Sequence, residues 1–146
     1  MNSPRQIILS RQQFEVIYQV TIELDNYQEE RLAKEGLTPW MLESLTDLVR
    51  YLRGPAEQSS KVRIRVVESP VVDALPFVGL QAGLGESENQ WEAVGQLDAT
   101  IAAAWQSLLR FVVSSLGDRE IFLRSGYRAD EVNAAIGALV IVDSLN

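Results

Sequence analysis

Apolar and polar residues near the N-terminus follow a pattern that fits two kinds of element. Ser10 is a typical helix N-cap, and Gln13 stands three residues later in the capping-box position. These signals predict a helix over residues 11–35. Residues 14–24 also alternate between apolar and polar positions and include many β-branched side chains, which is typical of a strand. The capping signals favour the helix, and the strand stays open as an alternative.

The next apolar pattern has clearer limits. Thr38 and Pro39 have the residue types preferred at the N-cap and at the first helical position. Apolar residues then recur at spacings of three and four over residues 39–53. Gly54 and Pro55 follow, and such a pair usually ends a helix. We therefore expect a helix over residues 39–53.

Strict alternation of apolar and basic residues marks residues 61–66 as a strand. Three apolar side chains would share one face of it and three basic side chains the other. A lone strand leaves its backbone groups without partners, so it needs a neighbour. The candidates are residues 6–9, residues 71–75, or the same strand of a second subunit.

The longest apolar pattern covers residues 88–116, where two adjacent apolar stripes leave only a narrow polar edge. Ser87 is in position to cap this helix, and Gly117 to end it. A further helix is expected from residue 129 to about residue 144. Such a widely apolar central helix is typical of a protein core or of an interface between subunits.

These elements together predict a mainly α protein. We expect a helical bundle around a long central helix (about residues 88–116), with a minimal β element near residues 61–67. The chain of 146 residues has the length of one ordinary domain and shows no linker or internal repeat. A single domain over residues 1–146 is the prediction.

Composition narrows the chemistry that this chain could perform. The sequence contains no His and no Cys. It therefore has no imidazole acid or base, no thiolate nucleophile and no Cys- or His-based zinc site. The carboxylates show no spacing typical of a metal-binding loop. We expect no catalytic residue, no metal and no cofactor, and the composition favours a protein that is not an enzyme.

The net charge and the length of the apolar runs indicate which kinds of partner this chain can bind. The formal net charge of −7 repels nucleic acid, and residues 129–144 carry acidic side chains but no Lys or Arg. The first ten residues lack the apolar core of a signal peptide. The longest later apolar run, residues 134–142, is far shorter than the about 20 residues of a membrane-spanning helix. We expect a cytoplasmic protein that binds neither nucleic acid nor membrane.

Two features suggest a surface for a protein partner: the basic face of the strand and an apolar loop over residues 70–80, interrupted by Pro and Gly. The predicted partner-binding residues are Lys61, Arg63, Arg65, Val71, Leu75, Phe77, Val78 and Leu80. Two alternatives stay open. The basic side chains could neutralise acidic neighbours within the chain or protect an edge strand, and the loop could cover the core.

The function predicted from these observations is that of a non-catalytic protein-interaction or regulatory protein. A homodimer is expected because the strand lacks an obvious neighbour and the central helix is unusually apolar. The alternative is a protein or enzyme that binds an anionic small molecule in a pocket under loop 71–80.

Overall fold

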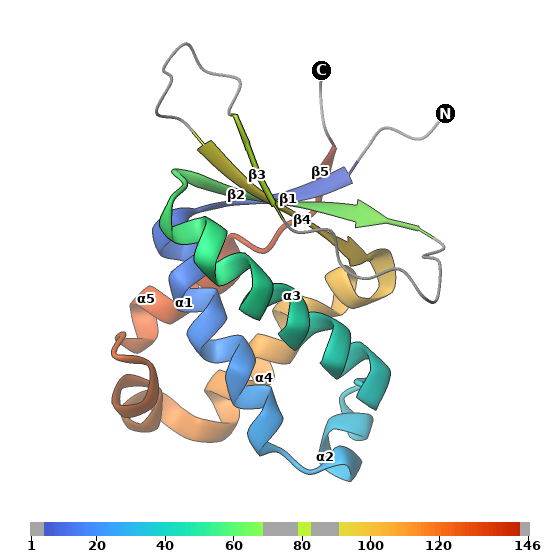
Figure 1. The fold of residues 1–146 in the computed structure, drawn as a ribbon. Helices are drawn as coiled ribbons and strands as arrows, with labels where there is room; N and C mark the ends of the chain where they lie inside the picture. The colour runs from blue at the N-terminus through green and yellow to red at the C-terminus, as the bar shows by residue number, and fades with distance from the viewer. Residues whose placement is uncertain (1–4, 69–78, 83–90, 144–146) are drawn as a thin grey trace.

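A mixed β-sheet carries the helices on one of its faces (Figure 1). The computed structural model describes residues 5–68, 79–82 and 91–143. The elements in chain order are β1 (Arg5–Ser10), α1 (Arg11–Thr21), the 3-10 helix η1 (Ile22–Asn26), α2 (Glu29–Lys34), α3 (Pro39–Glu57), β2 (Lys61–Val67), β3 (Gly79–Ala82), β4 (Trp91–Asp98), α4 (Ala99–Ser125), α5 (Ala129–Gly137) and β5 (Val142–Asp143). The protein is thus mainly helical with a minor β element, as the sequence predicts.

The strands lie in the order β3-β4-β2-β1-β5, which places β2 at the centre of the sheet. β1 runs antiparallel to β2, with Ile7 opposite Ile64. β4 runs parallel to β2 on the other side, with Gly95 opposite Ile64. Of the three candidate neighbours of the basic strand, residues 6–9 are therefore confirmed, and the second neighbour, β4, was not among the candidates. β2 is paired along both edges, so it does not need a strand from a second subunit.

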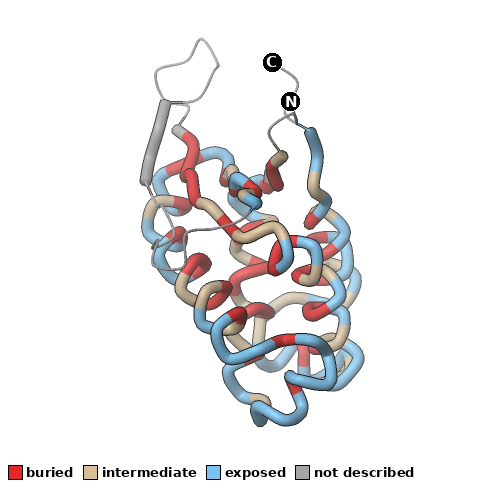
Figure 2. Tube along the Cα trace, turned by 90° about the vertical axis from the view of Figure 1, so that its right-hand side faces the viewer, coloured by how far each residue is buried: buried red, intermediate tan, exposed pale blue. Residues whose placement is uncertain are grey.

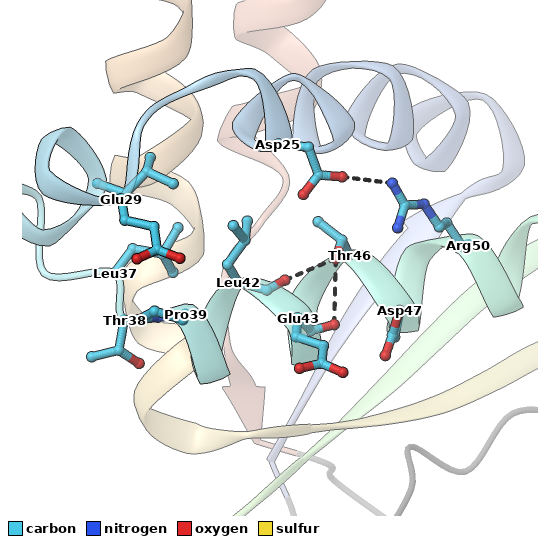
Figure 3. A pocket seen from close by; sticks show the side chains of 11 residues that line it. Asp25, Glu29, Leu37, Thr38, Pro39, Leu42, Glu43, Thr46, Asp47 and Arg50 are labelled. Atoms are coloured by element: carbon cyan, nitrogen blue, oxygen red, sulfur yellow. Dashed lines mark hydrogen bonds and ion pairs between the residues drawn. The ribbon is translucent and has the colours of Figure 1, made fainter.

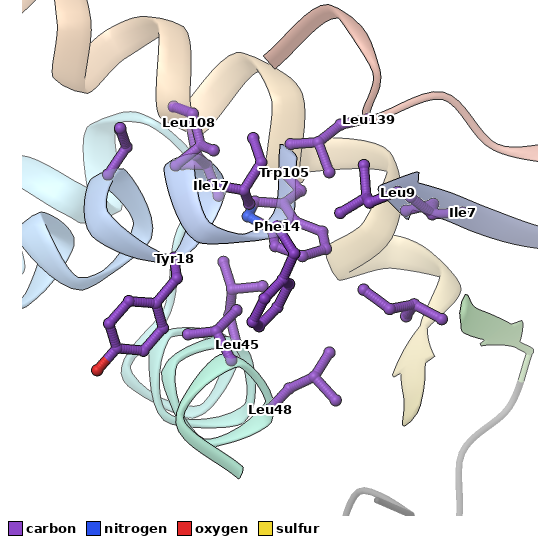
Figure 4. Packing of buried hydrophobic residues seen from close by; sticks show 14 of the residues in the cluster. Ile7, Leu9, Phe14, Ile17, Tyr18, Leu45, Leu48, Trp105, Leu108 and Leu139 are labelled. Carbon is purple, nitrogen blue, oxygen red and sulfur yellow. The ribbon is translucent and has the colours of Figure 1, made fainter. Parts of the chain in front are cut away.

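The core lies between the inner face of the sheet and the helices. Figure 4 shows Ile7 and Leu9 of β1 close to Phe14, Leu48 and Trp105 from three helices. The indole Nε1 of Trp105 donates a hydrogen bond to Thr21 Oγ1 at 3.1 Å, which satisfies a fully buried polar atom. In Figure 2 the buried positions face the middle of the molecule, and the outer turns of the helices are exposed.

The prediction of a helix over residues 88–116 is wrong at its beginning. Residues 91–98 form strand β4, and the helix begins at Ala99. Its N-cap is Asp98, whose carboxylate accepts hydrogen bonds from the backbone N–H groups of Thr100 and Ile101; Ser87 lies outside the described residues. Pairing with β2 decides the conformation of β4, because backbone partners along a neighbouring strand outweigh a weak helical periodicity.

The bundle is not confirmed either, because the helices form a layer against the sheet. The β element is also larger than the single strand expected near residues 61–67: β1, β3, β4 and β5 join β2. A sheet with one buried face needs helices only on that face, and this arrangement replaces a core closed by helices alone.

The helix predicted over residues 11–35 is divided in the structure. The Ser10–Gln13 capping box is present in both directions, so the predicted start is confirmed and the strand alternative is wrong for the residues of α1. The α-helix ends at Thr21, however, and η1 and α2 follow. Asp25 and Asn26 lie at the end of η1, where Asp25 accepts a hydrogen bond from Arg50 and Asn26 donates one to Glu23.

Two other helix ends differ from expectation. The helix predicted over residues 39–53 begins at the expected Thr38 cap but continues to Glu57, with Pro55 inside its last turn. Pro55 is tolerated there because it removes one bond only, to the carbonyl of the exposed Tyr51. The helix expected to reach residue 144 ends at Gly137, and the chain then pairs with β1 through β5.

Gly117 ends the regular part of α4, as its sequence position predicts. Its backbone has φ 82° and ψ 164°, a conformation that is essentially restricted to glycine. The chain then forms a further helical stretch up to Ser125, and Gly126 follows with φ 83°. This change of direction brings the end of α4 toward α5 (Figure 1).

We predict that Gly117→Ala lowers the free energy of unfolding by about 1–3 kcal/mol, because alanine is strained at this φ although its Cβ would meet no atom within 4 Å. Gly54→Ala is the matched control inside α3, where φ is ordinary and the space is equally open. It should raise the free energy of unfolding by about 0.4–1 kcal/mol. Urea denaturation measures both, and equal effects would contradict the assignment of strain to Gly117.

Candidate functional site

The three basic residues predicted as a partner surface lie on the outer face of the sheet, which we define as the face opposite the helices. Val62 and Ile64 of β2 point into the core, so the alternate positions Lys61, Arg63 and Arg65 point outward. The sequence pattern therefore placed these side chains on the correct face. They differ in exposure: Arg63 is partly buried, whereas Lys61 and Arg65 are exposed.

Arg63 is held by an internal network across three strands. Its Nε and Nη2 donate to the two carboxylate oxygens of Glu92 on β4, both at 3.0 Å. Its Nη1 donates to Gln6 Oε1 on β1 at 2.5 Å. The side chains of Arg63 and Glu92 are only 16% and 7% exposed. For Arg63 the structure thus confirms the alternative that the basic side chains neutralise acidic neighbours within the chain.

The electrostatics of this pair follow from its geometry. The hydrogen bonds from Arg63 lower the pKa of Glu92 below its ordinary value, against the opposing effect of burial, and the positive charges of Arg63, Lys61 and Arg65 add to the lowering. The same contact raises the pKa of Arg63. Both groups remain charged near neutral pH, so the network joins β1, β2 and β4 through a charge-assisted, bidentate contact.

Lys61 and Arg65 occupy the positions before and after Arg63 on the outer face. Both side chains are exposed, and neither forms an ion pair within the described part of the chain. Ile8 and Val67 are partly exposed on the same face. The outer face therefore presents two exposed cations, neither in a direct ion pair within the described chain, with apolar side chains nearby.

Most of the apolar residues predicted for the partner surface belong to a segment outside the described residues. Val71, Leu75, Phe77 and Val78 lie outside the described residues. Leu80 belongs to β3, and its backbone lies opposite Ala93 of β4; the structure describes this strand by its backbone alone. The pocket predicted under loop 71–80 lies outside the described residues for the same reason.

The structure forms a pocket that sequence analysis did not predict, between η1, α2 and α3 (Figure 3). It has a volume of about 290 Å³ and is lined by Asp25, Glu29, Leu32, Leu37, Thr38, Pro39, Leu42, Glu43, Thr46, Asp47 and Arg50. Arg50 donates to Asp25 at 2.5 Å, and Thr46 Oγ1 donates to the carbonyl of Leu42 at 2.9 Å. The carboxylates come from separate elements, so only the tertiary fold brings them together.

A metal site in the described part of the chain would need a group of side chains arranged as ligands. Over residues 5–68, 79–82 and 91–143, no group of three or more His, Cys, Asp or Glu side chains is arranged to hold a metal ion. The carboxylates of Asp25, Glu29, Glu43 and Asp47 line the pocket between η1, α2 and α3 and form its charged rim.

Helix α4 is long and apolar enough, by length and composition, to cross a membrane. A helix in a protein core meets the same criterion. In this structure Ile101, Trp105 and Val112 of α4 are fully buried, and the backbone at Gly117 is not helical. α4 contacts α1, α5, β2 and β4, and 33% of its most apolar 18-residue stretch is buried.

Comparison of the chain with protein-family models, curated proteins and solved structures finds no match. The class is therefore defined by the fold and the surfaces alone. The chain is a mainly helical protein whose helices cover one face of a small mixed sheet, with an exposed basic pair on the other face and an acidic pocket among the helices.

We predict that Glu92→Gln lowers the free energy of unfolding by about 3 kcal/mol at pH 7, because it leaves the Arg63 guanidinium charged and poorly paired. The loss should shrink in acid. The pKa of Glu92 is lower in the folded than in the unfolded chain, so its contribution is complete above the unfolded value of about 4.3 and is lost as pH falls through the folded value.

Urea denaturation from pH 7 to pH 3 measures this difference. Glu68→Gln is the control, because Glu68 forms an exposed pair with Arg5 and should contribute less than about 1 kcal/mol. The double variant Arg63→Met/Glu92→Leu removes both charges and should be near neutral. A Glu92→Gln effect as small as that of Glu68→Gln, or one that does not change with pH, would contradict the prediction.

Proposed function

We propose that this chain is a non-catalytic protein-interaction or regulatory protein, and that the outer face of its sheet binds an acidic segment of a protein partner. The observation that carries the proposal is the position of Lys61 and Arg65. They are exposed on the central strand, on the face without helices, and neither has an ion-pair partner within the described residues. Lys61 and Arg65 lie four residues apart on the strand, about 13 Å, and the nearby carboxylate of Glu92 is already held by two hydrogen bonds from Arg63. Acidic groups of a partner would therefore give each exposed cation a counterion of its own.

The intervening Arg63 supports the proposal in a different way. Its contacts with Glu92 and Gln6 fix the backbone of three adjacent strands. The two exposed cations therefore project from a rigid surface, which reduces the entropy lost on binding. Ile8 and Val67 add apolar area beside the charges.

A protein partner fits this surface better than nucleic acid does. The net charge of −7 opposes a long polyanion, and two exposed cations release few counterions. An acidic peptide segment with apolar neighbours requires only a local match of charge and shape. The same reasoning places the protein away from anionic membranes, and we propose a cytoplasmic location.

We predict that Lys61→Glu/Arg65→Glu weakens partner binding at least tenfold while the protein stays folded, because both side chains are exposed and make no ion pair in the described chain. The control variant Arg110→Glu/Arg119→Glu makes the same change of charge at exposed positions of α4. Affinity capture from a lysate of the source organism compares the wild type with both variants, and circular dichroism checks folding.

A protein retained by the wild type and by the control, but lost from the sheet variant, is the expected result. Retention of the same proteins by the sheet variant would contradict the proposed surface. Retention of none would favour the alternative, a small-molecule binding protein or an enzyme. In that alternative a thermal-shift screen of anionic metabolites would find a compound that raises the melting temperature.

Self-association is also part of the proposal, although the argument from an unpaired strand no longer applies. Its present support is Phe122 and Leu123, which are 51% and 61% exposed near the end of α4. Large apolar side chains that are adjacent and exposed are typical of interfaces.

We predict that light scattering at high micromolar concentration gives the mass of a homodimer, and that Phe122→Asp/Leu123→Asp gives a folded monomer because it places charges at the apolar contact. Val140→Asp, at another exposed apolar position, is the control and should leave the mass unchanged. A monomer mass for the wild type would contradict the proposed dimer.

A further inference from the structure

We propose that the pocket between η1, α2 and α3 is a second docking site, which binds a Lys or Arg side chain of a short basic and apolar segment in a protein partner. This site is independent of the outer face of the sheet, and its charge is of the opposite sign. Three features of the pocket carry the proposal: its apolar wall, its charged rim and the aromatic side chains beside it.

The apolar wall comes from leucines on both sides of the turn between α2 and α3. Leu32 and Leu37 are almost fully buried, and Leu42 is partly exposed. The backbone N–H of Leu37 donates to the carbonyl of Leu32 at 3.0 Å, which fixes this wall. The volume of about 290 Å³ is at the lower limit for small-molecule sites, so it suits one or two inserted side chains better than a cofactor.

The charge of the rim selects a cation. Among the residues that the structure describes, Arg50 is the one basic residue that lines this pocket, and it forms an ion pair with Asp25. Glu29, Glu43 and Asp47 form no ion pair within the described residues. Figure 3 shows Glu29 and Glu43 coming from different helices around the same pocket. The long stem of a Lys or Arg side chain would lie along Leu42, the partly exposed leucine of the wall, while its charged end meets these carboxylates.

The neighbouring surface of α3 indicates a protein rather than a free cation. Trp40 and Tyr51 are 47% and 59% exposed. They are eleven residues apart, which places them on one side of the helix, next to Asp47. Trp and Tyr are enriched where proteins bind each other, and both attract Lys and Arg over their ring faces. A peptide segment would contact the pocket and this aromatic side together.

The test is a peptide-display selection on the full chain, followed by binding measurements with the enriched peptides. We expect Lys or Arg beside apolar residues in these peptides. Glu43→Lys/Asp47→Lys should weaken their binding at least tenfold, and Trp40→Ala should weaken it severalfold. Asp118→Lys/Asp143→Lys makes the same change of charge at exposed positions elsewhere and should leave binding unchanged.

Chemical-shift mapping of the complex should place the peptide at α2 and α3. Peptides without enrichment in Lys or Arg, or peptides that bind Glu43→Lys/Asp47→Lys as tightly as the wild type, would overturn the proposal. A fall in the light-scattering mass of that variant would overturn it in favour of a second copy of the chain as occupant. The sheet variant Lys61→Glu/Arg65→Glu should bind the peptides normally, so the outcome is independent of the first proposed surface.

Discussion

The pairing of β2 with strands on both of its edges is the constraint on which the rest of the structure depends. It satisfies the backbone of the strand with the strictest alternation, and it fixes which face of that strand is buried. Because β4 is held parallel to β2, the chain enters α4 directly at Asp98, under the sheet. The position of α4, and of Trp105 within it, follows from that entry point.

The same pairing explains why an ionic network lies near the centre of the outer face. Arg63 lies between β1 and β4, so one guanidinium can reach Gln6 on one side and Glu92 on the other. A buried pair of this kind contributes little net stability compared with apolar residues, but the loss of one partner alone is costly because it leaves a buried charge unpaired. The network thus joins the three strands from whose outer face Lys61 and Arg65 project.

Charge is distributed unevenly over the molecule. The exposed cations lie on the outer face of the sheet, whereas the pocket carboxylates lie among η1, α2 and α3, on the side of the sheet that the helices cover (Figure 1). Two surfaces of opposite sign on one chain fit a protein that contacts more than one partner segment.

The sequence by itself determined the features that depend on near neighbours along the chain. These include the Ser10 and Thr38 caps and the helix break at Gly117, which rest on contacts within a few residues. They also include the separation of apolar and basic side chains onto opposite faces of β2, which follows from their strict alternation along the chain. Only the tertiary structure decided that residues 91–98 are a strand, because their conformation depends on pairing with β2 about thirty residues earlier. It alone also decided that Arg63 meets Glu92 and that the carboxylates of η1, α2 and α3 gather around one pocket, since long-range packing sets those distances.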